Sequence, residues 1–205
     1  MSKTNAPPLL ESGDRLSREE FHRRYSELPG VRAELVQGVV YVHSPVRARY
    51  HGQQHFAVTR WIGAYLDSHP GVQAMIDATV ILDPDTEVQP DVLLLREPAP
   101  PGGAYINDDG YIEGAPPFIV EIAASSASYD LHDKLRVYER AGVLEYVVWR
   151  TVDEAIDWFR LRDGAFVRIE SDAHGIIEST TFPGLRLHVA KLLAGDMAGV
   201  LAALG

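Results

Sequence analysis

The chain has 205 residues, of which 46% are hydrophobic, and it contains no cysteine. This length and composition favour one globular domain with a real core. The lack of cysteine excludes disulfide scaffolds, thiolate metal sites and cysteine nucleophiles. The net charge of −10 argues against nucleic-acid binding that relies on the overall field of the protein.

The first residues give two expectations about organisation and location. Residues 1–14, MSKTNAPPLLESGD, are predicted to form a disordered tail, and residues 15–205 a single domain. The tail lacks the apolar segment of a signal peptide, and no apolar run in the chain approaches the length of a membrane helix. We therefore expect a cytoplasmic protein without membrane contact.

Charge is unevenly distributed along the chain. Residues 1–60 hold nine Lys/Arg against six Asp/Glu, whereas the remainder is strongly acidic. Residues 43–60 contain Arg47, Arg49 and Arg60 and no acid at all. This basic strip is either an ordinary solvated surface or a surface that contacts phosphate groups, and the sequence leaves both open.

Elements in the first half alternate between helix and strand. Ser17 with Glu20 three residues later predicts a helix that Pro29 closes. A hairpin or kinked strand is expected over 33–45 around Gly38, and apolar residues at helical spacing predict a helix over about 52–68. One strand is expected over 72–83, followed by a turn over 84–89.

The second half continues this alternation. Buried strands are predicted over 90–97 and 118–124, separated by a long Pro/Gly/Asp loop. A helix is expected over 125–142, with Asp130 as its N-cap and Gly142 as its stop. A strand over 144–150, a hairpin around Asp163-Gly164 and a C-terminal amphipathic helix complete an α/β fold, with a mixed central β-sheet flanked by helices and extra N-terminal and C-terminal hairpins.

Two acids interrupt the most apolar strands. Asp91 precedes Val92, and Glu121 follows Phe118-Ile119-Val120. A buried carboxylate needs a partner, and a divalent cation is the most economical shared one. If the two strands are antiparallel neighbours, both carboxyls can meet at one end of the sheet, where Glu34 is a candidate third acid.

Lysine and histidine are candidates to complete such a site. Residues 130, 134 and 138 share one helix face, so Asp130, Lys134 and Tyr138 are expected to point the same way. Lys134 can then orient a water or stabilise developing charge on phosphorus, and His51 at a helix start can contact a phosphate. Structural alternatives are a Glu121–Lys134 salt bridge, a helix cap for His51 and helix packing for Tyr138.

The ordered string of these residues resembles the PD-(D/E)xK nuclease superfamily, and within it the Uma-type restriction endonuclease family, also described as DUF820-like. The resemblance covers roughly residues 15–165. It rests on these positions: Glu34-Leu35, Gly38, His51, Pro90-Asp91, Glu121-Ile122, Ser125, Ser126, Asp130, Lys134, Tyr138, Gly142 and Glu145-Tyr146.

The resemblance implies a restriction-endonuclease-like fold and an Mg²⁺-dependent DNA endonuclease. Asp91 and Glu121 would hold the metal with help from Glu34, and Lys134 would complete the catalytic set. Mn²⁺ is a possible substitute, and His51, Arg47 and Arg49 are candidate phosphate contacts. The sequence departs from the superfamily at Ala123, where the usual lysine would stand. In the Uma-type pattern that lysine corresponds to Lys134.

Two other functions compete with the endonuclease. The acidic net charge and Ala123 favour a nuclease fold without catalysis, acting as an oligomeric scaffold or nucleic-acid-binding module. A metal hydrolase acting on small phosphoesters fits the same carboxylates but not the basic strip. For an endonuclease, cutting both strands of DNA favours a homodimer, with the apolar C-terminal helix as a candidate interface.

Overall fold

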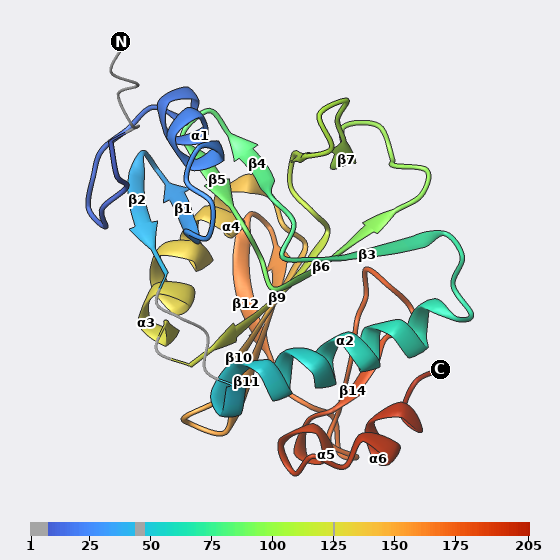
Figure 1. Ribbon diagram of the computed structural model, residues 1–205. Helices are drawn as coiled ribbons and strands as arrows, with labels where there is room; N and C mark the ends of the chain where they lie inside the picture. Colours follow the sequence, from blue (N-terminus) through green and yellow to red (C-terminus); the bar gives the residue numbers. More distant parts are fainter. Residues whose placement is uncertain (1–7, 44–47, 125) are drawn as a thin grey trace, which may run out of the picture.

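A mixed six-stranded sheet forms the centre of the protein, seen in a computed structural model that describes residues 8–43, 48–124 and 126–205 (Figure 1). The strand order is β12-β11-β10-β9-β6-β3, in which only the β9–β10 pair is parallel. The strands are β3 (Val72–Ile76), β6 (Val92–Arg96), β9 (Phe118–Ala123), β10 (Glu145–Arg150), β11 (Ala155–Arg162) and β12 (Ala165–Ile169). The predicted mixed α/β fold is confirmed.

A second six-stranded sheet packs on one side of the central sheet. Its order is β2-β1-β5-β4-β8-β7, and the predicted N-terminal hairpin β1–β2 forms one edge. The strands are β1 (Ala33–Val36), β2 (Val39–Val42), β4 (Val80–Asp83), β5 (Thr86–Val88), β7 (Tyr105–Ile106) and β8 (Ile112–Glu113). The expected C-terminal hairpin around Asp163-Gly164 is β11–β12 of the central sheet. A separate pair, β13 (Ile176–Glu178) with β14 (Arg186–His188), was not predicted.

Helices and two π-helical turns flank the sheets (Figure 1). They are α1 (Arg18–Ser26), η1 (Ala48–Gly52), α2 (Gln53–Leu66), α3 (Ala127–Tyr129), η2 (Asp130–Lys134), α4 (Leu135–Ala141), α5 (Val189–Leu193) and α6 (Met197–Leu201). None of the helices within the described ranges has the length and apolar character needed to span a bilayer.

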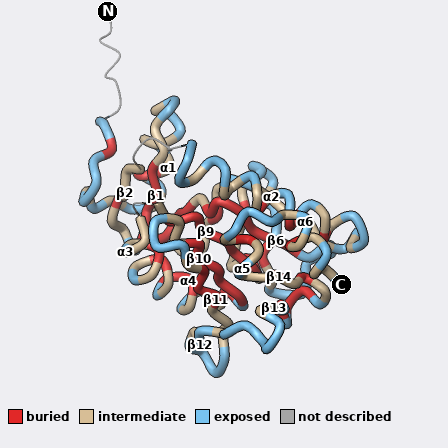
Figure 2. The backbone as a smooth tube through the Cα atoms, turned by 90° about the horizontal axis from the view of Figure 1, so that it is seen from below, coloured by how far each residue is buried: buried red, intermediate tan, exposed pale blue. Residues whose placement is uncertain are grey.

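The two faces of β9 lead to different surroundings, because successive strand side chains point to opposite faces. Val120 and Ile122 pack in one apolar cluster with α2, α5 and α6. Ile119 and Ala123 pack on the other side with α4 and the second sheet. Figure 2 shows β9 and β10 as part of the buried interior. Glu121 falls on the same face as Ile119 and Ala123, the face that α4 covers.

Several local predictions are confirmed. The Ser17 hydroxyl accepts a hydrogen bond from the Glu20 backbone N–H at 3.3 Å and caps α1. Asp163 and Gly164 have φ values of 52° and 81°, as a two-residue hairpin turn between β11 and β12 requires. Gly142 ends α4 in the left-handed conformation with φ 90°.

The strand predicted over 72–83 is wrong as a single element. The chain leaves β3 at Asp77, which has φ 51° and donates its backbone N–H to the Asp91 carbonyl at 3.2 Å. β3 therefore joins the central sheet, whereas β4 joins the second sheet. The predicted turn over 84–89 contains the buried strand β5, and the long loop contains the hairpin β7–β8.

Helix boundaries also differ from the predictions. Ser126, not Asp130, precedes the helical segment, and Asp130 begins the π-helical turn η2 instead of serving as N-cap. The C-terminal helix is divided in two at Gly195, whose φ is 73°. Asp196 then caps α6 by accepting from the Gly199 N–H at 3.0 Å.

Part of the predicted tail packs on the domain. Leu10 is buried, and the Gly13 N–H donates to the Val40 carbonyl at 2.8 Å. Ordered contacts with β2 therefore begin before residue 15. Residues 1–7, together with Arg47 and Ser125, lie outside the described residues.

Candidate active site

Asp91 and Glu121 meet where β6 and β9 run side by side. The strands are antiparallel, as expected, and Val92 pairs with Val120. Continued by one residue, this register places Asp91 opposite Glu121. The Ile122 N–H donates to Asp91 Oδ2 at 2.7 Å, which fixes the Asp91 carboxylate against β9. Both acids are almost fully buried, with Asp91 6% and Glu121 4% exposed.

Lys134 reaches these carboxylates from η2. Its Nζ lies 2.8 Å from Glu121 Oε1 and 2.8 Å from Glu34 Oε1. The Tyr138 hydroxyl donates to the same Glu121 oxygen at 3.0 Å. The expected common direction of Lys134 and Tyr138 is therefore confirmed. The ammonium group that Ala123 cannot supply comes from this neighbouring helical turn.

Glu34 has partners on both of its carboxylate oxygens. Oε1 contacts Lys134 and also accepts from the Gln89 backbone N–H at 2.7 Å. Oε2 lies 2.9 Å from His43 Nε2 and accepts from the Tyr129 hydroxyl at 3.2 Å. The carboxylate is completely buried. Glu34 is thus held as an anion next to Lys134.

His51 bridges the Asp91 side of the site. Its Nε2 lies 3.1 Å from Asp91 Oδ1, and its Nδ1 lies 3.0 Å from the Ile122 carbonyl oxygen. The hydrogen bond with Asp91 raises the pKa of His51, so an imidazolium that donates from both nitrogens fits these two acceptors. His55 Nε2 lies 3.0 Å from the Asp91 main-chain oxygen. One ligand atom from each of His51, His55 and Asp91 lies within 4.8 Å of the others.

Two carboxylates compete for the Lys134 ammonium, and their pKa values shift in opposite directions. Burial acts to raise the pKa of Glu34, but Lys134 and His43 outweigh it and hold that pKa at about 2. Burial also raises the pKa of Glu121. This pKa stays well above its usual value, although the positive charge of Lys134 lowers it. One positive charge cannot balance both acids, so Glu121 is the carboxyl of the two that more readily takes up a proton.

Lys134 itself remains an ammonium. Burial acts to lower its pKa, but Glu121 and Glu34 raise it well above the usual value. Asp130, which is 3% exposed, adds a further carboxyl group, and burial raises its pKa to about 6. The buried acids of this site therefore outnumber its cations.

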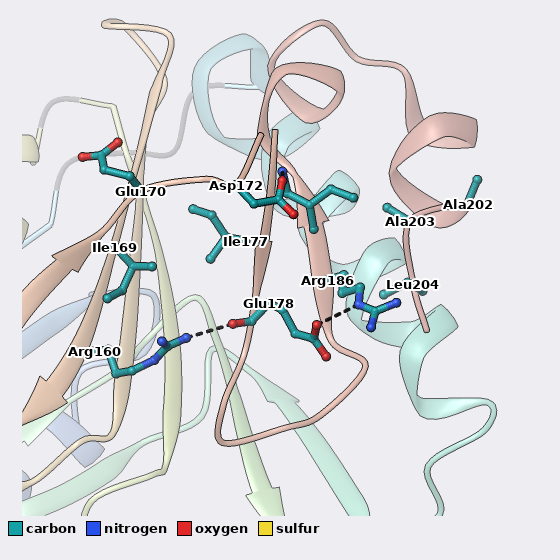
Figure 3. Close-up of a pocket in the computed structure, with 11 residues that line it drawn as sticks. Arg160, Ile169, Glu170, Asp172, Ile177, Glu178, Arg186, Ala202, Ala203 and Leu204 are labelled. Carbon is teal, nitrogen blue, oxygen red and sulfur yellow. Dashed lines mark hydrogen bonds and ion pairs between the residues drawn. The ribbon is translucent and has the colours of Figure 1, made fainter. Parts of the chain in front are cut away.

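These residues line a cavity of about 1010 Å³. Its interior carries Asp91, Glu121, Asp130 and Lys134, and Tyr50 and Val152 also line it. A second cavity, of about 610 Å³, lies between β11, the β13–β14 hairpin and the C-terminal residues (Figure 3). There Arg186 pairs with Glu178 at 2.9 Å, and Arg160 donates to the Glu178 carbonyl.

The structure brings together most of the predicted site residues. Glu34, Asp91, Glu121 and Lys134 form one connected group, and His51 joins it through Asp91. Arg49 is exposed, with its guanidinium carbon 6.0 Å from the centre of the Tyr50 ring. The remaining predicted phosphate contact, Arg47, is not among the described residues.

Sequence reasoning missed two residues that hold Glu34. His43 lies just beyond β2, and Tyr129 lies on α3, where its ring stacks on Tyr41 with centroids 4.3 Å apart. The adjacency of Tyr129 to Asp130 was a usable signal for it. For His43 the signal was the predicted hairpin, because Glu34 pairs with Tyr41 and His43, two residues further along, lies on the same face.

Comparison with known proteins identifies a family and a similar structure. The model of the Uma2 family, described as "Putative restriction endonuclease", matches residues 18–190. No curated protein matches the chain. A similar solved structure is a "putative nuclease belonging to DUF820" from Anabaena variabilis ATCC 29413, with 13% sequence identity and a TM-score of 0.66. The match covers 84% of this chain and 96% of that one, and at this identity it shows a shared fold.

Proposed function

Because the chain belongs to the Uma2 family of nuclease-like proteins, we propose that it is a divalent-metal-dependent endonuclease that hydrolyses phosphodiester bonds in DNA. The observation that carries this proposal is the excess of buried negative charge at one end of β6 and β9. Glu34, Asp91, Glu121 and Asp130 are all buried there, with Lys134 as the buried ammonium among them.

The residues present fit a hard divalent cation. Asp91 and Glu121 come from adjacent strands, and the Ile122 carbonyl adds an oxygen beside Asp91. The side-chain hydrogen bonds of Glu121 with other described residues reach only Oε1, so Oε2 is available as a ligand. Oxygen ligands of this kind favour Mg²⁺ or Mn²⁺. We propose Asp91 and Glu121 as the ligands of Mg²⁺, which would act as a Lewis acid and activate a water.

Lys134 is proposed to stabilise negative charge that develops on the phosphate. Its raised pKa keeps it protonated at neutral pH, so it is a poor proton acceptor and a good electrostatic partner. Tyr138 and Glu34 fix its surroundings from two sides. A positively charged group held in a dry site requires little reorganisation as the reaction proceeds.

Glu34 and His51 are proposed as positioning residues. Glu34 would have to give up His43 or Tyr129 to reach a metal, so we assign it to holding Lys134 instead of to the metal. Both ring nitrogens of His51 are engaged, with Asp91 and with Ile122, which favours orientation of Asp91 over a phosphate contact.

The inactive-scaffold alternative loses one of its two supports. It rested partly on Ala123, and Lys134 supplies the ammonium group from η2 at 2.8 Å from Glu121. The net charge of −10 still favours it. The homodimer remains a prediction, with cleavage of both strands as its rationale.

Cleavage of plasmid DNA and of single-stranded DNA with Mg²⁺ or Mn²⁺ at low salt tests the proposal. We expect Asp91→Asn and Glu121→Gln each to lower the rate by at least about 10²-fold, the order seen when one preorganised electrostatic group is lost. Glu178→Gln is the matched control, because Glu178 lines the second cavity, and its rate should equal that of the unmodified protein.

Metal binding is measured separately by calorimetry with Mn²⁺. Binding should weaken in Asp91→Asn and Glu121→Gln but not in Glu178→Gln. If His51→Ala and His55→Ala abolish binding while Glu121→Gln leaves it intact, the metal lies on the histidine side instead. DNA left intact by the unmodified protein, with hydrolysis of a chromogenic phosphodiester, would identify a small-phosphoester hydrolase.

A further inference from the structure

An exposed aromatic ring lies at the entrance of the active-site cavity. Tyr50 and Val152 form this entrance, which we call the lip. Tyr50 is 41% exposed, although it directly precedes His51, which contacts the buried Asp91. Val152 is 65% exposed and lines the same cavity. An aromatic and an aliphatic side chain therefore face solvent in a cavity whose interior carries Asp91, Glu121, Asp130 and Lys134.

Hydrogen bonds through Thr151 connect this lip to the central sheet. The Thr151 hydroxyl donates to the Tyr50 carbonyl at 2.7 Å, and the Thr151 N–H donates to the Ala123 carbonyl at 3.0 Å. Ala123 ends β9, the strand that carries Glu121. The main chain of Tyr50, along with Val152 and the carboxylates, is thus tied to one end of the central sheet, which places the Tyr50 residue close to the carboxylates.

The depth of the carboxylates limits what can reach them. Asp91 is 6% and Glu121 4% exposed, whereas the lip residues are ten or so times more exposed. A duplex is stiff and keeps its phosphates on a wide cylinder, so it presents them to recessed carboxylates less readily than a flexible strand does. A single strand can bend into the cavity and turn a base outward.

The net charge of the protein also favours a single strand over a duplex. Duplex binding relies on neutralising many phosphates, which a protein of net charge −10 does poorly. Arg49 lies beside the Tyr50 ring, with 6.0 Å from its guanidinium carbon to the ring centre. One arginine with one exposed ring suits a short stretch of single strand, in which stacking replaces part of the electrostatic attraction.

We propose that Tyr50 is a base-stacking residue and that the substrate is single-stranded DNA, or an unpaired segment of DNA, with the base next to the scissile phosphate on the Tyr50 ring. This inference deepens the proposed nuclease function and rests on it. Arg49 contacts the phosphate adjoining the stacked nucleotide. Val152 covers the other side of the entrance.

The test is binding of a short single-stranded oligonucleotide containing 2-aminopurine, measured by fluorescence in Ca²⁺ and again in EDTA. Stacking on Tyr50 should quench the fluorescence. Tyr50→Ala should weaken binding about tenfold, within the range known for base–aromatic stacking, and Tyr50→Phe should retain it. Tyr105→Ala is the matched control, because Tyr105 on β7 is 49% exposed and is not one of the residues lining this cavity.

A hairpin duplex of the same sequence should bind at least tenfold more weakly than the single strand. The inference is overturned if no oligonucleotide binds, if the duplex binds as tightly, or if Tyr50→Ala binds like the unmodified protein. Stacking without cleavage in Mg²⁺ would overturn the proposed nuclease function and leave Tyr50 as a binding residue. An unchanged cleavage rate in Tyr50→Ala would support the proposed nuclease function and overturn the stacking role of Tyr50.

Discussion

The two cavities described above are both lined by charged side chains, but the charged groups differ in burial and in balance. In the larger cavity, Glu34, Glu121 and Lys134 are 0–4% exposed, and two carboxylates contact one ammonium. In the smaller cavity, Glu178 and Arg186 form a one-to-one pair with side chains 43% and 41% exposed (Figure 3). The first group is buried and unbalanced, whereas the second is a half-exposed pair whose two charges cancel.

This difference indicates which cavity performs chemistry. A surface ion pair contributes little to stability, and water screens it. A buried group with excess charge is costly to fold and persists where that charge has a use. The cavity around Glu121 has that property, because burial raises the pKa of Glu121 well above its usual value in spite of the nearby Lys134.

The largest expected effect comes from removing the buried cation. Lys134→Met leaves Glu34 and Glu121 without their common partner, so we expect unfolding to become easier by about 3–5 kcal/mol at neutral pH. Thermal denaturation should show a melting temperature lower by roughly 10 °C.

A double variant sharpens that test. Lys134→Met with Glu121→Gln removes one negative charge along with the positive one and should recover part of the lost stability. A melting temperature for Lys134→Met equal to that of the unmodified protein would show that the carboxylates are solvated or neutral, and the contrast between the cavities would fail.

The next effect is a dependence on pH with opposite signs in the two cavities. Asp130 has an ordinary pKa of 3.8 that burial raises to about 6 in the folded state. Above pH 3.8 the unfolded chain ionises first, so stability falls as the pH rises to about 6 and stays reduced above it. Asp130→Asn should therefore be more stable than the unmodified protein above pH 6, by an amount on the order of 1 kcal/mol.

Asp172 lines the second cavity and provides the comparison. Hydrogen bonds from the Ile176 and His174 backbone lower its pKa below 3.8, so its ionised form favours the folded state above that pH. Asp172→Asn should lower the melting temperature at pH 8 and leave it unchanged at very low pH. Melting curves that shift in the same direction for both variants would contradict these assignments.

The smallest effect is expected at the surface pair. Arg186→Gln removes the partner of Glu178 in the second cavity, and we expect a loss of less than about 1 kcal/mol. DNA cleavage should not change. High salt should reduce the difference further, because both side chains are well exposed. A loss comparable to that of Lys134→Met would show that this pair is not an ordinary surface pair.

The sequence predicted which side chains lie together better than it predicted the helices and strands around them. Asp91 and Glu121 were recognisable because an acid beside Val92 or after Val120 violates the apolar pattern of a buried strand. Lys134 followed from helical spacing. The break at Asp77 was not recognisable, because the residues of β3 and β4 read as one apolar run. Which sheet each half joins depends on long-range pairing with β6 and β5.

The sequence by itself determined the local patterns: the apolar run of β9, the cap at Ser17, the turn at Asp163-Gly164, and the acids and lysine in a characteristic order. These depend on neighbours within a few residues, where backbone geometry is fixed by residue type. Only the tertiary structure decided that Glu34 and Glu121 share Lys134, that His43 and Tyr129 hold Glu34, and that Tyr50 lies at the entrance. Those contacts join residues far apart in the chain, and their energies depend on burial, which exists only once the sheets and helices have packed.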